Sequence, residues 1–429
     1  MLEGHVHPDF WSVARQLRRV IPRHGRGGAA VCIYHRGECV ADLWGGSRDG
    51  AGSPWTSDTL ALCYSTTKGV LATLVHTLVD RGVLAYDDPV AKHWPGFARR
   101  GKAGITLRQL LCHEAGLFRI APLIDHARRM FDWDHMVSVL EDAEPAHVPG
   151  AAHGYHGLTY GWLVGELLQR ATGVDLCELI ERQLVAPLAL DGLYIGLPAS
   201  AQSRRAELVQ GQLTVDPQGR SRARRRTRLI GRGLRATGVP IDLGELEAAL
   251  MPVGIEDLDF NAAEMSRAIV PAVNGMFTAR SLARVYAALA GGGVLEGVRL
   301  LGERTLAEAT RIHNQGLGRV VPFPMNWRLG YHRIPTVRVK APRAFGHFGI
   351  GGSGAFADPD RDLAVSLVLN SGMGTPFGDT RILRITSAAL QSADARREPS
   401  AAMEPAAAAI EEDWTADAAS PRSRIAEEM

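Results

Sequence analysis

The two ends of this chain carry strand-forming patterns and its middle carries helical ones, which limits the folds that it can adopt. Two β-prone runs, 29–35 and 38–43, are separated by Arg36 and Gly37, a connection typical of a tight hairpin. Further strand-like runs return at 344–348, 353–357 and 363–370. A single antiparallel sheet built from both ends, with a helical insert between them, is the most economical topology that pairs these strands.

Apolar residues recur at helical spacing from about residue 65 to residue 270. One stripe ends at Gly82, another ends at Gly173, and an amphipathic helix is expected over 8–21. We therefore predict an α+β fold in which an antiparallel sheet flanked by helices is joined to a mainly α-helical subdomain. The α/β subdomain is expected to comprise residues 1–60 and 271–392, and the helical subdomain residues 61–270.

Two segments have an irregular composition. Residues 202–237 hold ten arginines against Glu207 and Asp216, which favours a surface insertion facing water and leaves an anionic membrane or an acidic partner as the alternative. Residues 393–429 are rich in alanine and acids among prolines and serines, a composition that cannot bury a core. We expect a disordered tail there.

The overall composition excludes several classes of protein. A net charge of +2 is too small to indicate a nucleic-acid partner, and no run of apolar residues is long enough to span a membrane. Five scattered cysteines and the lack of a signal-peptide pattern lead us to expect a cytoplasmic protein. Because zinc-ligand spacings and a P-loop are also missing from the sequence, we predict neither a metal nor a cofactor.

The most informative motif is Ser65-Thr66-Thr67-Lys68, at the start of the best-patterned helix. Only four of the 48 basic residues are lysine, so an S-x-x-K spacing would rarely arise by chance. Three residues along a helix place both side chains on one face, where a neutral Lys68 amine can take the proton of the Ser65 hydroxyl. Spacing alone also fits a helix cap beside a solvated lysine, so the surrounding motifs must decide.

Those surroundings resemble the serine β-lactamase-like family, which includes class C β-lactamases, D-alanyl-D-alanine carboxypeptidases and family VIII carboxylesterases. Order and separations fit over roughly residues 28–392. The matching blocks are Trp55–Leu60, Tyr64–Gly69, Leu78–Gly82 with Asp87–Val90, Ile105–Leu117, Pro149–Gly150, Tyr155–Gly165 and Gly346–Pro359.

The resemblance implies roles for particular residues. Ser65 would be the acylated nucleophile and Lys68 its proton-transfer partner, while Tyr155 would complete the relay as a phenol or a phenolate. The family's K-T-G motif is replaced by His347-Phe348-Gly349. The oxyanion would lie between the backbone N–H groups of Ser65 and Ile350, with an uncertainty of one residue at the second position.

Two departures from the family's motifs bear on the substrate. His347 replaces the K-T-G lysine that meets a substrate carboxylate, and Gly157 replaces the asparagine of Y-x-N. Both favour a carboxylesterase that acts on small-molecule esters of short to medium chain length. A β-lactamase or D-alanyl-D-alanine peptidase, an acyltransferase with the same nucleophile, and a non-catalytic binding protein are the alternatives, and the oligomeric state is open.

Overall fold

The computed structural model describes residues 2–22, 27–209, 243–321, 323–372, 379–396 and 402–406. Its central feature is an eight-stranded sheet of order β13-β1-β3-β2-β12-β11-β10-β9, in which every neighbouring pair is antiparallel. The strands are β1 (Leu2–Val6), β2 (Gly28–His35), β3 (Glu38–Gly46), β9 (His332–Arg333), β10 (Phe345–Phe348), β11 (Gly354–Asp358), β12 (Leu363–Leu369) and β13 (Glu404–Pro405). The predicted α+β fold, with an antiparallel sheet built from both ends of the chain, is confirmed.

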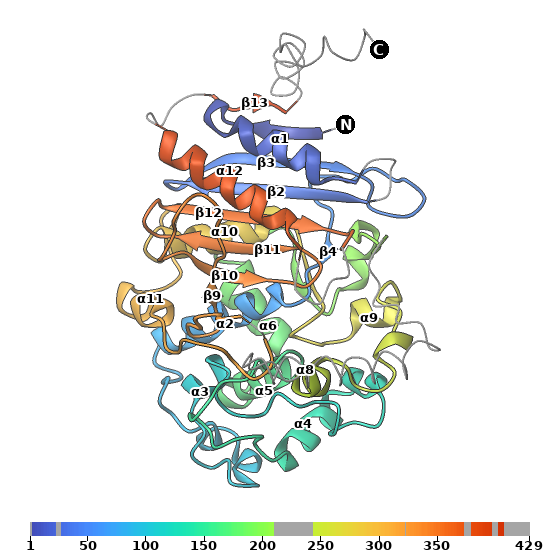
Figure 1. The fold of residues 1–429 in the computed structure, drawn as a ribbon, viewed down its shortest axis with the longest axis vertical. Coiled ribbons are helices and arrows are strands. Elements are labelled where there is room, and N and C mark those ends of the chain that lie inside the picture. The colour runs from blue at the N-terminus through green and yellow to red at the C-terminus, as the bar shows by residue number, and fades with distance from the viewer. Residues whose placement is uncertain are drawn as a thin grey trace, which may run out of the picture.

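Strands from the two ends of the chain meet where β2 pairs with β12, for example Val31 with Leu367. Alternate residues of β2 contribute to two different apolar clusters: Val31 packs on the side of α1 (Trp11–Val20) and α12 (Arg381–Ala395), and Cys32 on the side of α10 (Ala279–Ala290). Figure 1 shows the sheet between these helices. Because both faces are covered, the strand is apolar at successive positions rather than at every second one.

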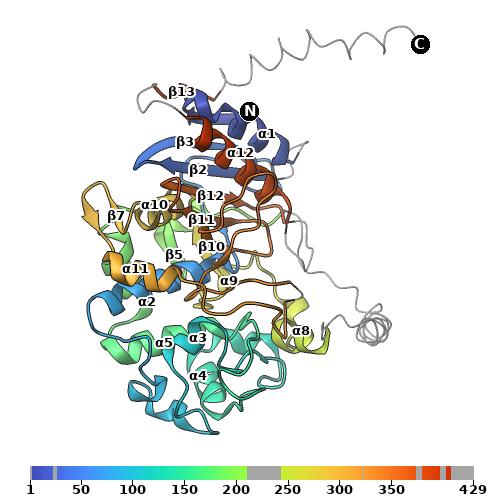
Figure 2. The same ribbon diagram turned by 60° about the vertical axis from the view of Figure 1, so that its left-hand side comes forward.

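The remaining elements lie mostly below the sheet in Figures 1 and 2. The helices are α2 (Thr66–Asp80), α3 (Leu107–Leu111), α4 (Trp133–Asp142), α5 (Tyr160–Thr172), α6 (Leu176–Ile180), α8 (Leu243–Leu250), α9 (Ala263–Arg267) and α11 (Glu303–Thr310). Short strands form two further sheets: β4 (Ala61–Leu62), β6 (Gly275–Phe277) and β5 (Leu193–Ile195) in one, and β7 (Val294–Leu295) with β8 (Val298–Arg299) in the other.

Single turns of other helix types connect these elements. The 3₁₀ turns are Pro8–Phe10, Val90–Lys92, Pro95–Ala98, Ala127–Phe131, Ala199–Arg204 and Ile255–Asp257, and Glu181–Val185 is a π-helical turn.

Helix α2 lies where the two parts of the fold meet. It contacts β10 of the sheet on one side and α5 of the helical part on another, and its residues from Thr66 to Leu78 are all buried. The first turn of this helix carries the S-x-x-K motif, so the fold places that motif at the seam.

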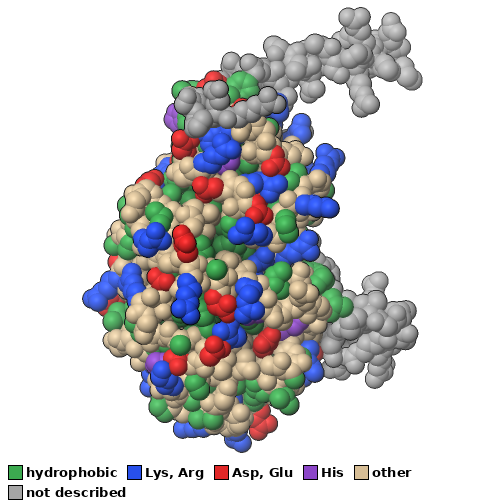
Figure 3. Space-filling view, turned by 90° about the vertical axis from the view of Figure 1, so that its left-hand side faces the viewer, with side chains coloured by type: hydrophobic (Ala, Val, Ile, Leu, Met, Phe, Trp, Pro, Cys, Tyr) green, Lys and Arg blue, Asp and Glu red, His purple; other side chains and the backbone are tan. Residues whose placement is uncertain are grey.

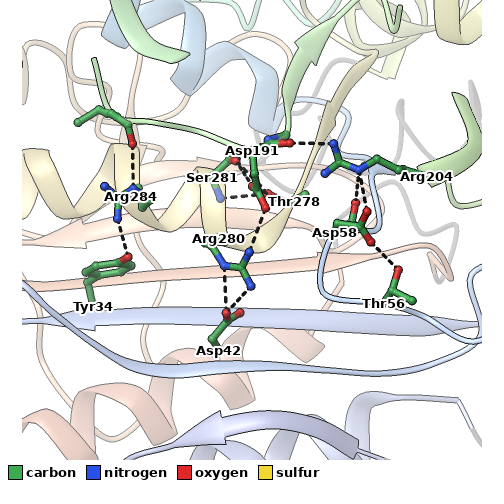
Figure 4. Close-up of polar contacts among 12 residues, drawn as sticks. Tyr34, Asp42, Thr56, Asp58, Asp191, Arg204, Thr278, Arg280, Ser281 and Arg284 are labelled. Carbon is green, nitrogen blue, oxygen red and sulfur yellow. Dashed lines mark hydrogen bonds and ion pairs between the residues drawn. The ribbon is translucent and has the colours of Figure 1, made fainter. Parts of the chain in front are cut away.

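A polar network fastens the helical part to the sheet (Figure 4). The Arg280 guanidinium on α10 donates to Asp42 of β3 at 2.7 Å and to Asp191 at 3.0 Å. Arg284, one turn later, donates to the carbonyl of Leu188 and to the hydroxyl of Tyr34. Each charged group has a partner, as partly buried charges require.

Order extends further into the two irregular segments than the sequence predicts. Arg204 is not a solvated residue of a surface insertion, because its guanidinium donates to the carbonyls of Asp58 and Asp191. Helix α12 continues past residue 393 to Ala395, since Ala393 is buried on the core, and β13 pairs with β1. The expectations for 210–237 and for most of 393–429 lie outside the described residues.

No helix in the described part of the chain combines the length and the apolar character needed to cross a membrane. Figure 3 shows acidic and basic side chains interspersed over one face, in keeping with a net charge of only +2. The cytoplasmic location stays a prediction.

Candidate active site

Ser65 is presented by a sharp turn between β4 and α2. Tyr64, immediately before it, has a φ of 45°, a left-handed backbone conformation that is strained for a bulky residue. The two threonines of the motif hold the turn: Thr66 Oγ1 donates to the carbonyl of Ser353 at 3.0 Å, and Thr67 Oγ1 to the carbonyl of Tyr64 at 2.6 Å. Strained backbone of this kind is characteristic of functional sites, where surrounding contacts maintain it.

Lys68 is buried, and its amine contacts three oxygen atoms. Its Nζ lies 3.0 Å from Ser65 Oγ, 2.7 Å from the carbonyl oxygen of Gly157 and 3.0 Å from that of Ala272. None of these oxygens carries a formal charge, and burial lowers the pKa of Lys68 well below its usual range. The neutral amine that a base requires is therefore favoured.

Tyr155 faces the same hydroxyl from the other side. Its Oη donates to Ser65 Oγ at 2.8 Å, and Lys68 Nζ lies 5.0 Å from the centre of its ring. Burial raises the pKa of Tyr155, and the hydrogen bond to Ser65 offsets only part of that rise. The neutral phenol is favoured, rather than the phenolate that the sequence left open.

A wall of neutral rings supports Tyr155. The Trp327 indole lies nearly parallel to the Tyr155 ring, at 5.5 Å between ring centres and 9° between planes, and His113 approaches Tyr155 edge-on at 5.0 Å. Burial lowers the pKa of His113 and that of its neighbour His156. Uncharged aromatic groups thus fix the phenol without adding a charge beside it.

The hydrogen bonds of the two histidines assign their protons. His156 Nε2 accepts the backbone N–H of Leu117 at 3.1 Å, so its own proton is on Nδ1 and is donated to His113 Nδ1. His113 Nδ1 also accepts the backbone N–H of His156 at 3.2 Å, which places the His113 proton on Nε2. Each ring is therefore held in a single tautomer.

The His347-Phe348-Gly349 motif, at the end of β10, borders the site. His347 on β10 is buried with its ring 6.3 Å from that of Tyr155, and burial lowers its pKa, so no cation occupies this position. Gly349 follows the strand, where a Cβ would overlap the carbonyl oxygen of Cys63. A side chain there would push the strand end away from the turn that carries Ser65.

Two backbone N–H groups, those of Ser65 and Ile350, are available as donors at the site. Ile350 lines the same cavity as Ser65, and within the described parts of the chain neither residue's backbone N–H has a hydrogen-bond acceptor. Unpaired N–H groups at a nucleophile are suited to an oxyanion, which needs two donors at once.

A cavity of about 780 Å³ opens at Ser65. Apolar side chains supply most of its lining. They include Leu246, Leu250, Met251, Phe260, Met265, Val270, Val273, Val321, Phe323 and Met325, while His332, Arg333, Asp379 and Thr380 contribute polar groups. Such a cavity suits a largely apolar small molecule.

The structure brings all six predicted site residues together: Ser65, Lys68, Tyr155, His347, Gly349 and Ile350. Sequence reasoning missed Trp327 and Leu250. Trp327 belongs to a segment without regular secondary structure, and Leu250 ends a short helix, so neither carried a motif or a long periodic pattern.

A serine one turn ahead of a buried lysine, at the start of a helix beside an antiparallel sheet, defines the class of active-site serine hydrolases related to β-lactamases. Residues 12–390 match the Beta-lactamase family, and the chain belongs to that family. The resemblance noted in the sequence is confirmed.

Relatives within the family carry several activities in their names. The chain is 36% identical over 379 residues to "Esterase/beta-lactamase LipL" of Mycobacterium tuberculosis, covering 86% of this chain and 82% of that protein. A family VIII carboxylesterase structure aligns with a TM-score of 0.79 at 32% identity, covering 91% of this chain and all of that one. A penicillin-binding protein homologue from Caulobacter crescentus aligns with a TM-score of 0.78 at 35% identity, with the same coverage.

Proposed function

We propose that this serine hydrolase is a carboxylesterase that cleaves small-molecule esters of short to medium chain length through an acyl-enzyme on Ser65. The observation that carries the proposal is the placement of Ser65 Oγ between Lys68 Nζ, at 3.0 Å, and Tyr155 Oη, at 2.8 Å, in the lining of a largely apolar cavity.

The contacts of Lys68 support its role as the base. A neutral amine has two N–H groups and one lone pair. The carbonyls of Gly157 and Ala272 take the two N–H groups, which leaves the lone pair to accept the hydroxyl proton of Ser65. Tyr155 already donates to the same oxygen, so the hydroxyl is oriented for transfer to Lys68.

Acylation then proceeds with one proton relayed through the site. Ser65 Oγ forms a bond to the ester carbonyl carbon while its proton moves to Lys68, and the N–H groups of Ser65 and Ile350 stabilise the oxyanion. When the carbon–oxygen bond to the alcohol breaks, Tyr155 gives its proton to the leaving alkoxide and recovers one from Lys68. In the second half-reaction, water attacks the acyl carbon and gives up a proton to the same groups. The bond between that carbon and Ser65 Oγ then breaks, the carboxylic acid leaves, and Ser65 regains its proton.

Two features favour an ester over a β-lactam. The neutral His347 stands where a cation would bind the lactam carboxylate, and most of the cavity is apolar. β-Lactam hydrolysis is the second candidate because Arg333 lines the same cavity, so a carboxylate could bind to its guanidinium.

The test is the initial rate of p-nitrophenyl butyrate hydrolysis by the wild-type protein and by Ser65→Ala, with nitrocefin assayed in parallel. We expect ester turnover that falls by about 10³-fold or more in the variant. Equal ester rates in both proteins would contradict the proposal, and faster turnover of nitrocefin would favour a β-lactamase. Faster release of p-nitrophenol on addition of an alcohol, with the ester of that alcohol as product, would identify an acyltransferase.

A further inference from the structure

The space around Gly157, and not its backbone conformation, is what excludes a side chain at this position. Its φ does not lie in the left-handed region, so the backbone would accept any residue. A Cβ built on Gly157 would overlap Leu250 Cδ2, the end of a side chain on another element. The space beside Gly157 is therefore already filled by Leu250.

Leu250 is held in this place by the main chain of α8. The carbonyl of Ala248 accepts the backbone N–H groups of Ile120 and Ala121, both at 2.9 Å. One turn earlier, Arg119 Nε donates to Glu245 Oε2 at 2.7 Å. These contacts fasten the helix to the segment that follows His113, and they fix Leu250 over the site.

Leu250 is also close to the reacting groups. The Gly157 carbonyl accepts from Lys68 Nζ at 2.7 Å, and Lys68 in turn lies 3.0 Å from Ser65 Oγ. Leu250 belongs to the same apolar cluster as Tyr155 and lines the cavity that opens at Ser65. A methyl-bearing side chain thus occupies the volume that a polar side chain at 157 would take.

We propose that the Leu250 side chain, which fills the space beside Gly157, forms the wall against which the acyl chain lies. The site thereby selects unbranched apolar acyl groups without a polar substituent near the carbonyl. The inference rests on the proposed esterase function. Because the acyl group stays bonded to Ser65 through both half-reactions, whereas the alcohol leaves after the first, a residue beside the acyl chain should affect deacylation as well as acylation.

The experiment is a double-mutant cycle with Gly157→Asn, Leu250→Ala and the combined variant. The substrates are p-nitrophenyl butyrate and the branched 2,2-dimethylpropanoate. We expect Leu250→Ala to raise the preference for the branched ester about tenfold, because truncation opens space beside the carbonyl. Gly157→Asn alone should turn the Leu250 side chain into the cavity and lower kcat/KM for butyrate about tenfold.

The combined variant carries the decisive result. Truncation of Leu250 should rescue most of the loss caused by Gly157→Asn, a coupling of about tenfold between two residues in contact. Leu246→Ala is the matched control, since it removes the same atoms from the same face of α8 but does not adjoin Gly157. It should show less than about twofold coupling with Gly157→Asn. Equal coupling for both leucines, or none for Leu250, would overturn the inference.

Two further readouts separate this inference from the proposed function. Single-turnover deacylation should change in Leu250→Ala, and a change confined to acylation would place Leu250 on the alcohol side and overturn the assignment. If the wild-type protein hydrolyses no ester, the proposed function fails. The wall is then tested by the rates at which the p-nitrophenyl esters of butylphosphonate and tert-butylphosphonate modify Ser65. The same coupling between Gly157→Asn and Leu250→Ala is expected.

Discussion

At the scale of single residues, the chemistry of the site depends on what surrounds one amine. Lys68 is buried, and its amine contacts two carbonyls and one hydroxyl, with no carboxylate among these contacts. Burial without a compensating negative charge lowers the pKa of Lys68, and this is how a lysine becomes a base near neutral pH.

Lys68→Arg should therefore lower kcat by about 10²- to 10⁴-fold, because a guanidinium keeps its proton and cannot accept one from Ser65. The measurement is steady-state turnover of p-nitrophenyl butyrate, with circular dichroism to check that the variant folds. Folded Lys68→Arg protein with more than about a tenth of wild-type kcat would show that Lys68 is not the base.

The pH profile should have an acid limb only. As pH falls through the lowered pKa of Lys68, the amine gains a proton and kcat/KM declines. At alkaline pH no decline is expected below about pH 10, because burial raises the pKa of Tyr155 above the usual value for a phenol. The check is kcat/KM across the range in which the protein stays folded, and a descending limb below about pH 9 would contradict the neutral-phenol assignment.

Sequence reasoning found residues of this site only where a motif carried them. Ser65 and Lys68 follow from their spacing, and Tyr155 from its block of matching residues. Trp327 and Leu250 could not be found in this way, because their roles arise from packing between segments far apart in the chain. The same holds for the protonation state of Tyr155, which burial decides.

At the scale of elements, α2 positions the site because it fits closely under its neighbours. A Cβ on Gly69 would overlap the hydroxyl of Tyr286, which projects from α10 and is buried. Gly69 thus leaves room for the Tyr286 side chain directly behind the S-x-x-K motif.

Gly69→Ala should lower the free energy of unfolding by about 1 to 2 kcal/mol. Overpacking against a buried ring costs about 1 to 3 kcal/mol, and the higher helix propensity of alanine returns up to about 1 kcal/mol. Urea denaturation measures the change. Gly104→Ala is the control, because nothing lies within 4 Å of a Cβ there and its φ is not left-handed. A Gly69→Ala protein as stable as this control would show that the Tyr286 side chain does not pack closely against Gly69.

The predicted elements match the structure where periodicity was strong. The hairpin at 29–35 and 38–43 corresponds to β2 and β3, and the late runs correspond to β10, β11 and β12. No pattern in the sequence indicated β1, because its five residues include Gly4 and its burial does not alternate strictly. This strand exists because β3 offers it an antiparallel partner, with His5 opposite Asp42.

At the scale of the whole molecule, buried histidines are distributed over both parts of the fold. Burial lowers the pKa of His35 on β2 and of His332 on β9 to about 4, and the pKa of His76 on α2 and of His156 near the site to about 3. In the unfolded chain each would titrate near its ordinary value of about 6.5. The unfolded state therefore binds more protons than the folded state between about pH 4 and pH 6.5.

The free energy of unfolding should accordingly fall as pH is lowered through that window, and it should be insensitive to these groups above about pH 6.5. One histidine that stays neutral when folded contributes a slope of up to about 1.4 kcal/mol per pH unit. His76 is the best test because both of its ring nitrogens are satisfied, by the Leu329 carbonyl and the Tyr86 hydroxyl, each at 2.9 Å.

His76→Gln should reduce the slope of the unfolding free energy against pH by the equivalent of about one proton, even though the variant is less stable at neutral pH. Urea midpoints at several pH values between about 4 and 7 give the slope for each protein. His5→Gln, which replaces an exposed histidine of β1, is the control for the loss of one histidine. Parallel curves for wild type and His76→Gln would mean that His76 binds a proton equally well in the folded and unfolded states, contrary to what its burial between the Leu329 carbonyl and the Tyr86 hydroxyl predicts.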